Sequence, residues 1–181
     1  MDLYFILLII LLIITICLLI FFSSYTKLKK YNEKMQKAEN VIDEELNKKL
    51  DLIIAINSEV KKVTGKKDYL KEYVSIRDLI ITNIEKDLKL DEACKLINDL
   101  VNDFEELQKD EEFIKNIRKL KEIDEVLISA KNMFNQSAIN NNQLIKSFPN
   151  NIVAKIAKYR MRSFFNINTF YNQNKSELEE I

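Results

Sequence analysis

The sequence predicts an all-α protein in which an N-terminal transmembrane helix continues into a long antiparallel helical bundle. Three observations predict this class. Residues Leu3 to Phe22 form 20 consecutive positions without a charge, the 181 residues include one glycine and one proline, and apolar residues recur every three or four positions. The apolar run suits a membrane helix, the scarcity of turn residues disfavours sheets, and the spacing is that of amphipathic helices.

The apolar run is long enough to cross the ~30 Å hydrocarbon core of a bilayer as one helix. A cleaved secretory signal has a basic start, a shorter apolar stretch and small residues at its end. Here the start carries only Asp2, and the stretch ends in Phe21-Phe22. Ile16 precedes Cys17, whereas lipoprotein signals carry a small residue there. We therefore expect an uncleaved anchor at residues 1–22.

The orientation of the anchor follows from the charges behind it. Residues 27–37 carry five lysines and one glutamate. The positive-inside rule places this side in the cytoplasm and the N-terminus outside, as in a single-pass protein of the cell membrane. Cys17 and Cys94 then need no disulfide, because the cytoplasm is reducing.

We expect one cytoplasmic bundle at residues 23–165 and a polar, flexible tail at 166–181. A helical stripe predicts a first arm from Ser23 to Thr64 that is continuous with the membrane helix, and Gly65 has the place of a helix C-cap. The stripe consists of Leu28, Tyr31, Met35, Ala38, Ile42, Leu46, Leu50, Ile53, Ile56, Val60 and Val63.

Two further arms are predicted, so that short connections give an up-down-up bundle of three arms. Asp91 resembles the N-cap of a new helix and predicts that the second arm is broken at residues 89–91. Asp110 predicts the start of the third arm, and Pro149 its end. The second stripe consists of Tyr69, Tyr73, Ile76, Ile80, Ile84, Leu88, Cys94, Ile97, Val101, Phe104 and Leu107.

Asp124 and Asn141 stand at positions of the third arm where the pattern calls for apolar side chains. Two interpretations remain at this point. The residues are partly exposed or set the register of the bundle through a buried hydrogen bond, or they belong to a binding site inside the bundle.

The zero net charge conceals strong local charge. Residues 91–112 carry nine acids and two lysines, opposite in sign to residues 27–37. The up-down-up order brings the two segments together as complementary surfaces, while Lys27, Lys29 and Lys30 also suit anionic lipid headgroups.

The same order gathers basic residues at the end far from the membrane. This end is either a solvated helix terminus or a basic tip for an acidic partner, and nucleic acid is not expected because the chain is neutral and has no recognition motif. The residues concerned are Lys61, Lys62, Lys66, Lys67, Lys146, Lys155, Lys158, Arg160 and Arg162.

The composition argues against an enzyme. The chain has no histidine, so triads and zinc or di-iron sites that require it are ruled out, and one glycine cannot form a glycine-rich phosphate loop. Cys94 lies on an apolar stripe and is interpreted as a small core residue. We expect no catalytic residue, cofactor or metal.

Several segments resemble the LemA family over residues 38–165, most specifically the Phe-Pro-Asn-Asn of residues 148–151. The residues that carry the resemblance are Ile42, Asp43, Asp51, Leu52, Ile53, Phe113, Ala130, Phe134, Phe148, Pro149, Asn150, Asn151 and Ala154. The resemblance implies a helical bundle on an N-terminal anchor and supplies no activity. Genes of the family often neighbour a membrane zinc metalloprotease, which implies such a protease as a partner.

The sequence departs from the family at three places. Glu39 stands where relatives commonly have tryptophan, Ile54 replaces a proline, and Phe104-Glu105 replaces a tyrosine-proline pair. We therefore expect straighter arms than in the relatives.

Residues 148–151 have a structural interpretation of their own. Phe148 closes the apolar stripe, Pro149 stops the helix, and Asn150 and Asn151 cap the next turn. The alternative is a loop that docks a partner.

These observations predict a membrane-anchored, non-enzymatic interaction or scaffold protein that binds another protein or itself. Two alternatives remain: a regulatory subunit that transmits movement through a continuous membrane-to-bundle helix, and an adaptor for a membrane protease.

Overall fold

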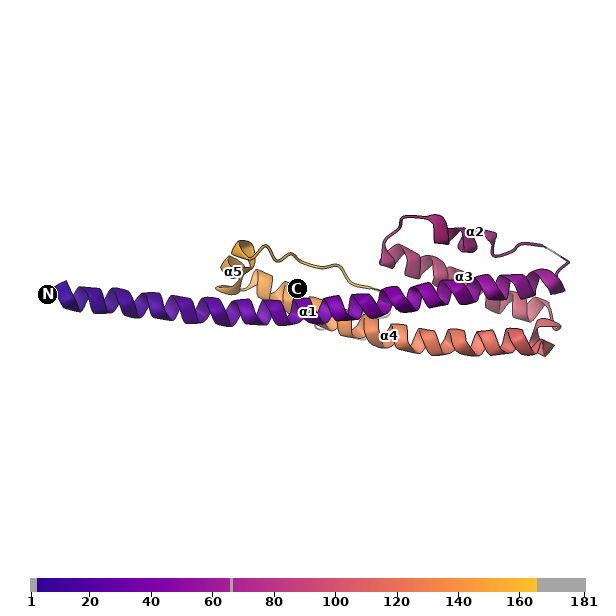
Figure 1. Cartoon of the computed structure of the whole chain (residues 1–181), viewed down its shortest axis with the longest axis horizontal. Helices are drawn as coiled ribbons and strands as arrows, with labels where there is room; N and C mark the ends of the chain where they lie inside the picture. The colour runs from indigo at the N-terminus through magenta and orange to yellow at the C-terminus, as the bar shows by residue number, and fades with distance from the viewer. Residues whose placement is uncertain (1–2, 66, 166–181) are drawn as a thin grey trace. The chain divides into compact units, whose positions relative to one another are not determined.

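The computed structural model describes residues 3–65 and 67–165, and these residues form helices and connecting segments without a strand (Figure 1). The all-α class with an apolar N-terminal helix is thereby confirmed. The predicted tail at 166–181 lies outside the described residues, as does Lys66.

Helix α1 extends from Leu3 to Val63 as one helix, so the predicted continuity of apolar run and first arm is confirmed. Its most apolar stretch of 18 residues is long and apolar enough to cross a membrane, and no part of that stretch is buried against the rest of the protein. Gly65, with a φ of +72°, follows the last turn, in which the Thr64 amide donates to the Val60 carbonyl at 2.9 Å. A left-handed residue at this place is the usual glycine-based end of a helix.

The chain divides into two compact units, which are described separately. Unit 1 comprises residues 1–37 and 133–181, and unit 2 comprises residues 38–132. Helix α1 contributes to both units, as does helix α4, which extends from Glu111 to Lys146.

Unit 2 starts with a chain reversal after α1. Helix α2 (Lys71–Val74) and the 3-10 turn η1 (Ser75–Asp78) lead back along α1. Contacts with α1 follow in reverse order, because Asp68 contacts Lys61 and the later Arg77 contacts Asp51. This return segment is therefore antiparallel to α1.

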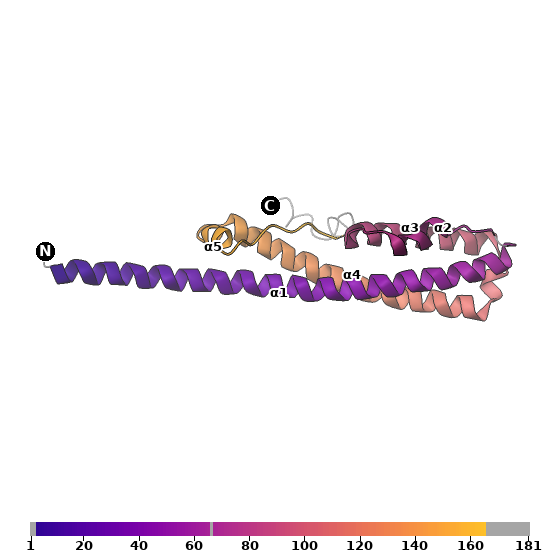
Figure 2. The ribbon, with the colours of Figure 1, turned by 45° about the horizontal axis from the view of Figure 1, so that its top comes forward.

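Helix α3 (Asn83–Asp103) then runs parallel to α1, and a second 3-10 turn, η2 (Leu107–Lys109), leads into α4. The direction of α3 follows from its contacts. Asp91, in the middle of α3, contacts Lys49. Phe104, just after α3, contacts Tyr69, and the neighbouring Asp68 pairs with Lys61 near the end of α1. Within unit 2, α4 is antiparallel to α1, since Asn116 contacts Glu59 and Asp124 contacts Lys49. Figure 2 shows α3 and α4 beside α1.

The predicted up-down-up order is therefore corrected to four passes, with the return segment as the additional one. The break in the second arm lies at residues 79–82 and not at 89–91. Thr82 forms a capping box with Glu85 and starts α3, whereas Asp91 lies inside that helix. The predicted second stripe continues as one helix through Ile80, but Ile80 is fully exposed (106 %) and lies between the helices.

The apolar stripe of α1 packs as predicted between Leu28 and Val60, where the stripe positions except Tyr31 are buried. The stripe of α3 differs from the predicted one, because Leu88 is exposed. The buried apolar side chains of α3 are Leu90, Ala93, Ile97 and Leu100.

Helix α4 begins as predicted, because Asp110 Oδ1 accepts hydrogen bonds from the amides of Glu112 and Phe113, each at 2.9 Å. The helix ends at Lys146, and Pro149 is the N-cap of α5 (Asn150–Ile156).

Phe148 is 79 % exposed, so the prediction that it closes the apolar stripe is wrong. The chain turns away from α4 before Phe148 and leaves its ring outside the core. The capping prediction also fails: α5 begins without a side-chain cap, and Asn150 Nδ2 donates to Ser147 Oγ at 2.8 Å instead.

In unit 1, α5 packs against α1 close to the apolar run. Leu28 forms a buried cluster with Val153 and Ala154, and Phe21, Leu144, Ile145 and Tyr159 pack against this cluster. The prediction that the C-terminal cations meet the far end of α1 is therefore wrong, because α4 runs antiparallel to α1 and α5 lies beside Leu28.

Candidate interaction groove and the buried charges beside it

Lys49 is the largest fully buried side chain among the described residues and joins three helices of unit 2. It is 1 % exposed, and its Nζ lies 2.7 Å from Oδ1 of both Asp91 in α3 and Asp124 in α4. Burial alone would lower the pKa of Lys49, but neighbouring negative groups, Asp91 and Asp124 among them, outweigh it and raise the pKa. The ammonium group is therefore charged at neutral pH.

This contact decides between the two interpretations of Asp124. The carboxylate sets the register of the bundle by pairing with Lys49, and its own side chain stays partly exposed. Asn141, the second polar residue of the stripe, is buried, and its Nδ2 donates to the Arg160 carbonyl at 3.2 Å.

A second ion pair links α3 and α4. Lys131 Nζ lies 2.5 Å from Asp87 Oδ1, and both side chains are buried. Burial raises the pKa of Asp87, while Lys131 opposes this shift. Sequence reasoning did not find this pair; the available signal is a charged residue at a helical spacing from buried apolar ones.

A third polar contact links α1 and α4. Asn116 Nδ2 donates to Glu59 Oε1 at 2.9 Å, while Glu59 Oε2 is buried without a hydrogen-bond partner. Burial raises the pKa of Glu59, and the charges of Glu112 and Asp110 add to the rise. Glu59 therefore destabilises the fold when it is ionised.

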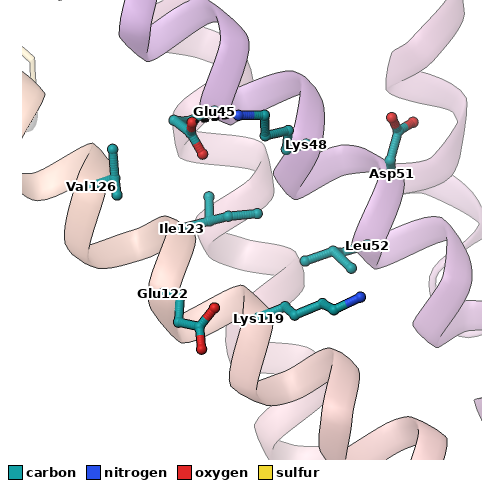
Figure 3. A pocket seen from close by; sticks show the side chains of 8 residues that line it. All are labelled: Glu45, Lys48, Asp51, Leu52, Lys119, Glu122, Ile123 and Val126. Carbon is teal, nitrogen blue, oxygen red and sulfur yellow. Dashed lines mark hydrogen bonds and ion pairs between the residues drawn. The ribbon is translucent and has the colours of Figure 1, made fainter.

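The face between α1 and α4 forms an open groove of about 600 Å³ in unit 2 (Figure 3). Its apolar residues are Leu52, Ile123 and Val126, and Val126 is exposed. Five charged residues surround them: Glu45, Lys48, Asp51, Lys119 and Glu122. Apolar side chains within a charged rim are the composition of a protein-interaction surface.

Of the residues that carry the family resemblance, Asp51 and Leu52 line this groove. Asp43 and Asn151 are exposed, and Pro149 and Asn150 are partly exposed in the turn before α5. The buried members are core residues, namely Ile42, Ile53, Phe113, Ala130, Phe134 and Ala154.

Two asparagines of α4 hold the chain that follows α5, a feature that sequence reasoning missed. Asn142 exchanges two hydrogen bonds of 2.9 Å with the backbone of Arg162, and Asn135 exchanges two of 2.8 Å with that of Phe165. Asn135 and Asn142 are seven residues apart in a helix, a rise of about 10 Å. Arg162 and Phe165 are three residues apart, and an extended chain of three residues spans nearly the same length. The signal in the sequence is two asparagines seven positions apart on one helix face.

The cations that were predicted to contact lipid or a partner occupy two kinds of position. Arg162 lies over the Phe134 ring at 5.7 Å and belongs to the segment that Asn135 and Asn142 bind. Lys29 pairs with Glu33 at 3.8 Å on the surface. The remaining members are exposed, namely Lys27, Lys30, Lys155, Lys158 and Arg160.

The predicted pairing of residues 27–37 with residues 91–112 is wrong. Asp91 pairs with Lys49, and α3 continues from there toward the Val63 end of α1 within unit 2. Among the described residues, no group of three or more His, Cys, Asp or Glu is arranged to hold a metal ion.

A long apolar N-terminal helix that continues into helical units with an apolar core and buried ion pairs defines the class of all-α helical-bundle proteins. The LemA family model matches residues 38–178, and the chain belongs to the LemA family. No curated protein and no solved structure matches the chain.

Lys49→Met should lower the free energy of unfolding by about 2–4 kcal/mol, because two carboxylates then face each other without their cation. Urea denaturation of the detergent-solubilised chain, followed by circular dichroism, measures the change. Lys48→Met is the matched control, since Lys48 pairs with Glu44 and Glu45 on the surface. The triple variant Lys49→Met/Asp91→Asn/Asp124→Asn should recover most of the loss. Equal effects of Lys49→Met and Lys48→Met would contradict the assignment.

Glu59→Gln should stabilise the protein at pH 7. The folded state raises the pKa of Glu59 above its ordinary value of 4.5, so ionisation costs stability as the pH rises above that value. The gain should therefore shrink as the pH falls toward 4.5. Thermal unfolding between these two pH values measures it, with Glu125→Gln as an exposed control. A stability gain that grows as the pH falls would contradict a raised pKa of Glu59 in the folded protein.

Proposed function

We propose that this LemA-family protein is a membrane-anchored, non-enzymatic interaction protein. The apolar run holds the chain in the cell membrane with the N-terminus outside, and units 1 and 2 lie in the cytoplasm. The lysines at residues 27–37 support this orientation through the positive-inside rule.

The open groove between α1 and α4 is the observation that carries the proposal. Leu52, Ile123 and Val126 supply apolar area that a helix or loop of a partner would cover, and the charged rim would fix its orientation. The ion pair of Lys49 with Asp124 keeps α1 and α4 in register, so the groove is formed before a partner binds.

Photo-crosslinking at the groove tests this proposal. With p-benzoylphenylalanine at Val126, we expect a defined crosslinked species in cells, identified by mass spectrometry. The same amino acid at Ile128 is the control, because Ile128 is exposed on α4 and does not line the groove. The double variant Lys119→Glu/Glu122→Lys should weaken the Val126 crosslink by reversing the rim charges.

The crosslinked species also decides the kind of partner. A second copy of this chain and a membrane metalloprotease, which the family resemblance implies, are the two expected identities. Identical crosslinking at Val126 and Ile128 would count against the groove as the contact surface.

A second candidate function is a regulatory subunit that transmits movement between the membrane and the bundle. The observation in its favour is that α1 is one helix from Leu3 to Val63. Inserting two glycines after Ser24 interrupts this helix. An interaction protein should keep its Val126 crosslink after the insertion, measured in the same assay. If the insertion abolishes the function of the protein in cells but leaves the Val126 crosslink intact, the result favours the regulatory subunit.

A further inference from the structure

Helix α5 lies against the part of α1 that emerges from the apolar run. Val153 and Ala154 of α5 are buried with Leu28, and Phe21 of the run itself packs against this cluster. Leu28 is six residues beyond Phe22, about 9 Å along the helix axis. The headgroup layer on each side of a bilayer is roughly 5–8 Å thick. A helix that packs on Phe21 and Leu28 is therefore at the height of the headgroups.

Aromatic side chains surround this junction. Tyr25 stacks with Phe21 at a centroid distance of 6.4 Å and lies 6.3 Å from the ring of Tyr159, which follows α5. Tyrosine is enriched at the boundary between hydrocarbon and headgroups, because its ring is apolar and its hydroxyl is polar. Tyr25 of α1 and Tyr159 after α5 therefore both lie at the level expected for the boundary between hydrocarbon and headgroups.

The opposite side of α5 is apolar and uncovered. Ile152 and Ile156 are one helical turn apart and therefore share a face, and Ile156 is 63 % exposed. Among the described residues after the N-terminal run, Phe148, just before α5, is the most exposed aromatic side chain. Exposed apolar side chains that lie together mark a surface for a partner or a membrane.

Cations accompany this apolar face. Lys155, Lys158 and Arg160 are exposed, and no acid occurs between Lys146 and Lys175. Lys158 has a φ of 58°, and the following Tyr159 amide donates to the Ala154 carbonyl at 3.0 Å. Glycine is the usual residue in such a left-handed helix end, so lysine at this position carries some backbone strain.

We propose that the face of α5 formed by Ile152 and Ile156 rests on the membrane leaflet that α1 enters. The exposed Phe148, which precedes α5, and the exposed cations Lys155, Lys158 and Arg160 join this contact. The apolar side chains enter the boundary between headgroups and acyl chains, and the cations bind anionic headgroups. This second membrane contact rests on the anchor of the proposed function and goes beyond it, because it fixes unit 1 on the bilayer surface.

Tryptophan fluorescence tests the contact, because the chain has no natural tryptophan. The full-length Ile156→Trp variant is reconstituted into phosphatidylcholine vesicles that contain brominated lipids, with and without phosphatidylglycerol. Ile128→Trp is the matched control in α4, since Ile128 is 59 % exposed. Ile10→Trp, within the apolar run, reports whether the anchor spans the bilayer.

We expect the Ile156→Trp variant to be quenched about twofold more strongly than the Ile128→Trp variant, and more in anionic than in neutral vesicles. Adding Lys155→Gln, Lys158→Gln and Arg160→Gln should remove the dependence on anionic lipid. Equal quenching of Ile156→Trp and Ile128→Trp, with Ile10→Trp quenched, overturns the contact and leaves the anchor. An unquenched Ile10→Trp variant overturns the anchor and the contact together. Equal quenching in neutral and anionic vesicles overturns the role of the cations.

Discussion

The pairing of Lys49 with two carboxylates is the constraint on which the arrangement of unit 2 depends. Lys49 comes from α1, Asp91 from α3 and Asp124 from α4, so one ammonium group fixes the relative register of three helices. An unpaired ammonium in this position would be expensive, since burial disfavours its charge. Shifting any of the three helices by one turn would separate the charges. Apolar stripes alone allow such shifts, because their side chains are interchangeable.

The direction of α4 follows from the same contacts and determines what surface the protein presents. Because α4 is antiparallel to α1 in unit 2, the two helices form the groove lined by Leu52, Ile123 and Val126. In unit 1, Asn135 and Asn142 bind the backbone after α5, and α5 packs on Leu28. The exposed cations Lys155 and Lys158 therefore lie on the segment that packs beside Leu28, a few residues after the apolar run.

The sequence predicted the features that depend on long periodicity and on local end signals. The stripe of α1, the end at Gly65 and the start at Asp110 were correct, since each depends on neighbouring residues alone. The return along α1 was missed because α2 and η1 are four residues each and show no periodicity. Lys49 was not recognised, because its partners are distant in the sequence. Phe148 was misplaced because its position depends on where the chain turns.

The distances between α1 and α4 test the central claim most directly. Spin labels at Lys62 of α1 and Glu112 of α4, both exposed, are compared with labels at Lys62 and Asn132, with Cys17 and Cys94 replaced. Double electron–electron resonance should give a short distance for the first pair and one longer by an amount approaching 30 Å for the second, as 20 residues of helix require. The reverse order would mean that α4 is parallel to α1 and would contradict the pairing of Lys49 with Asp124.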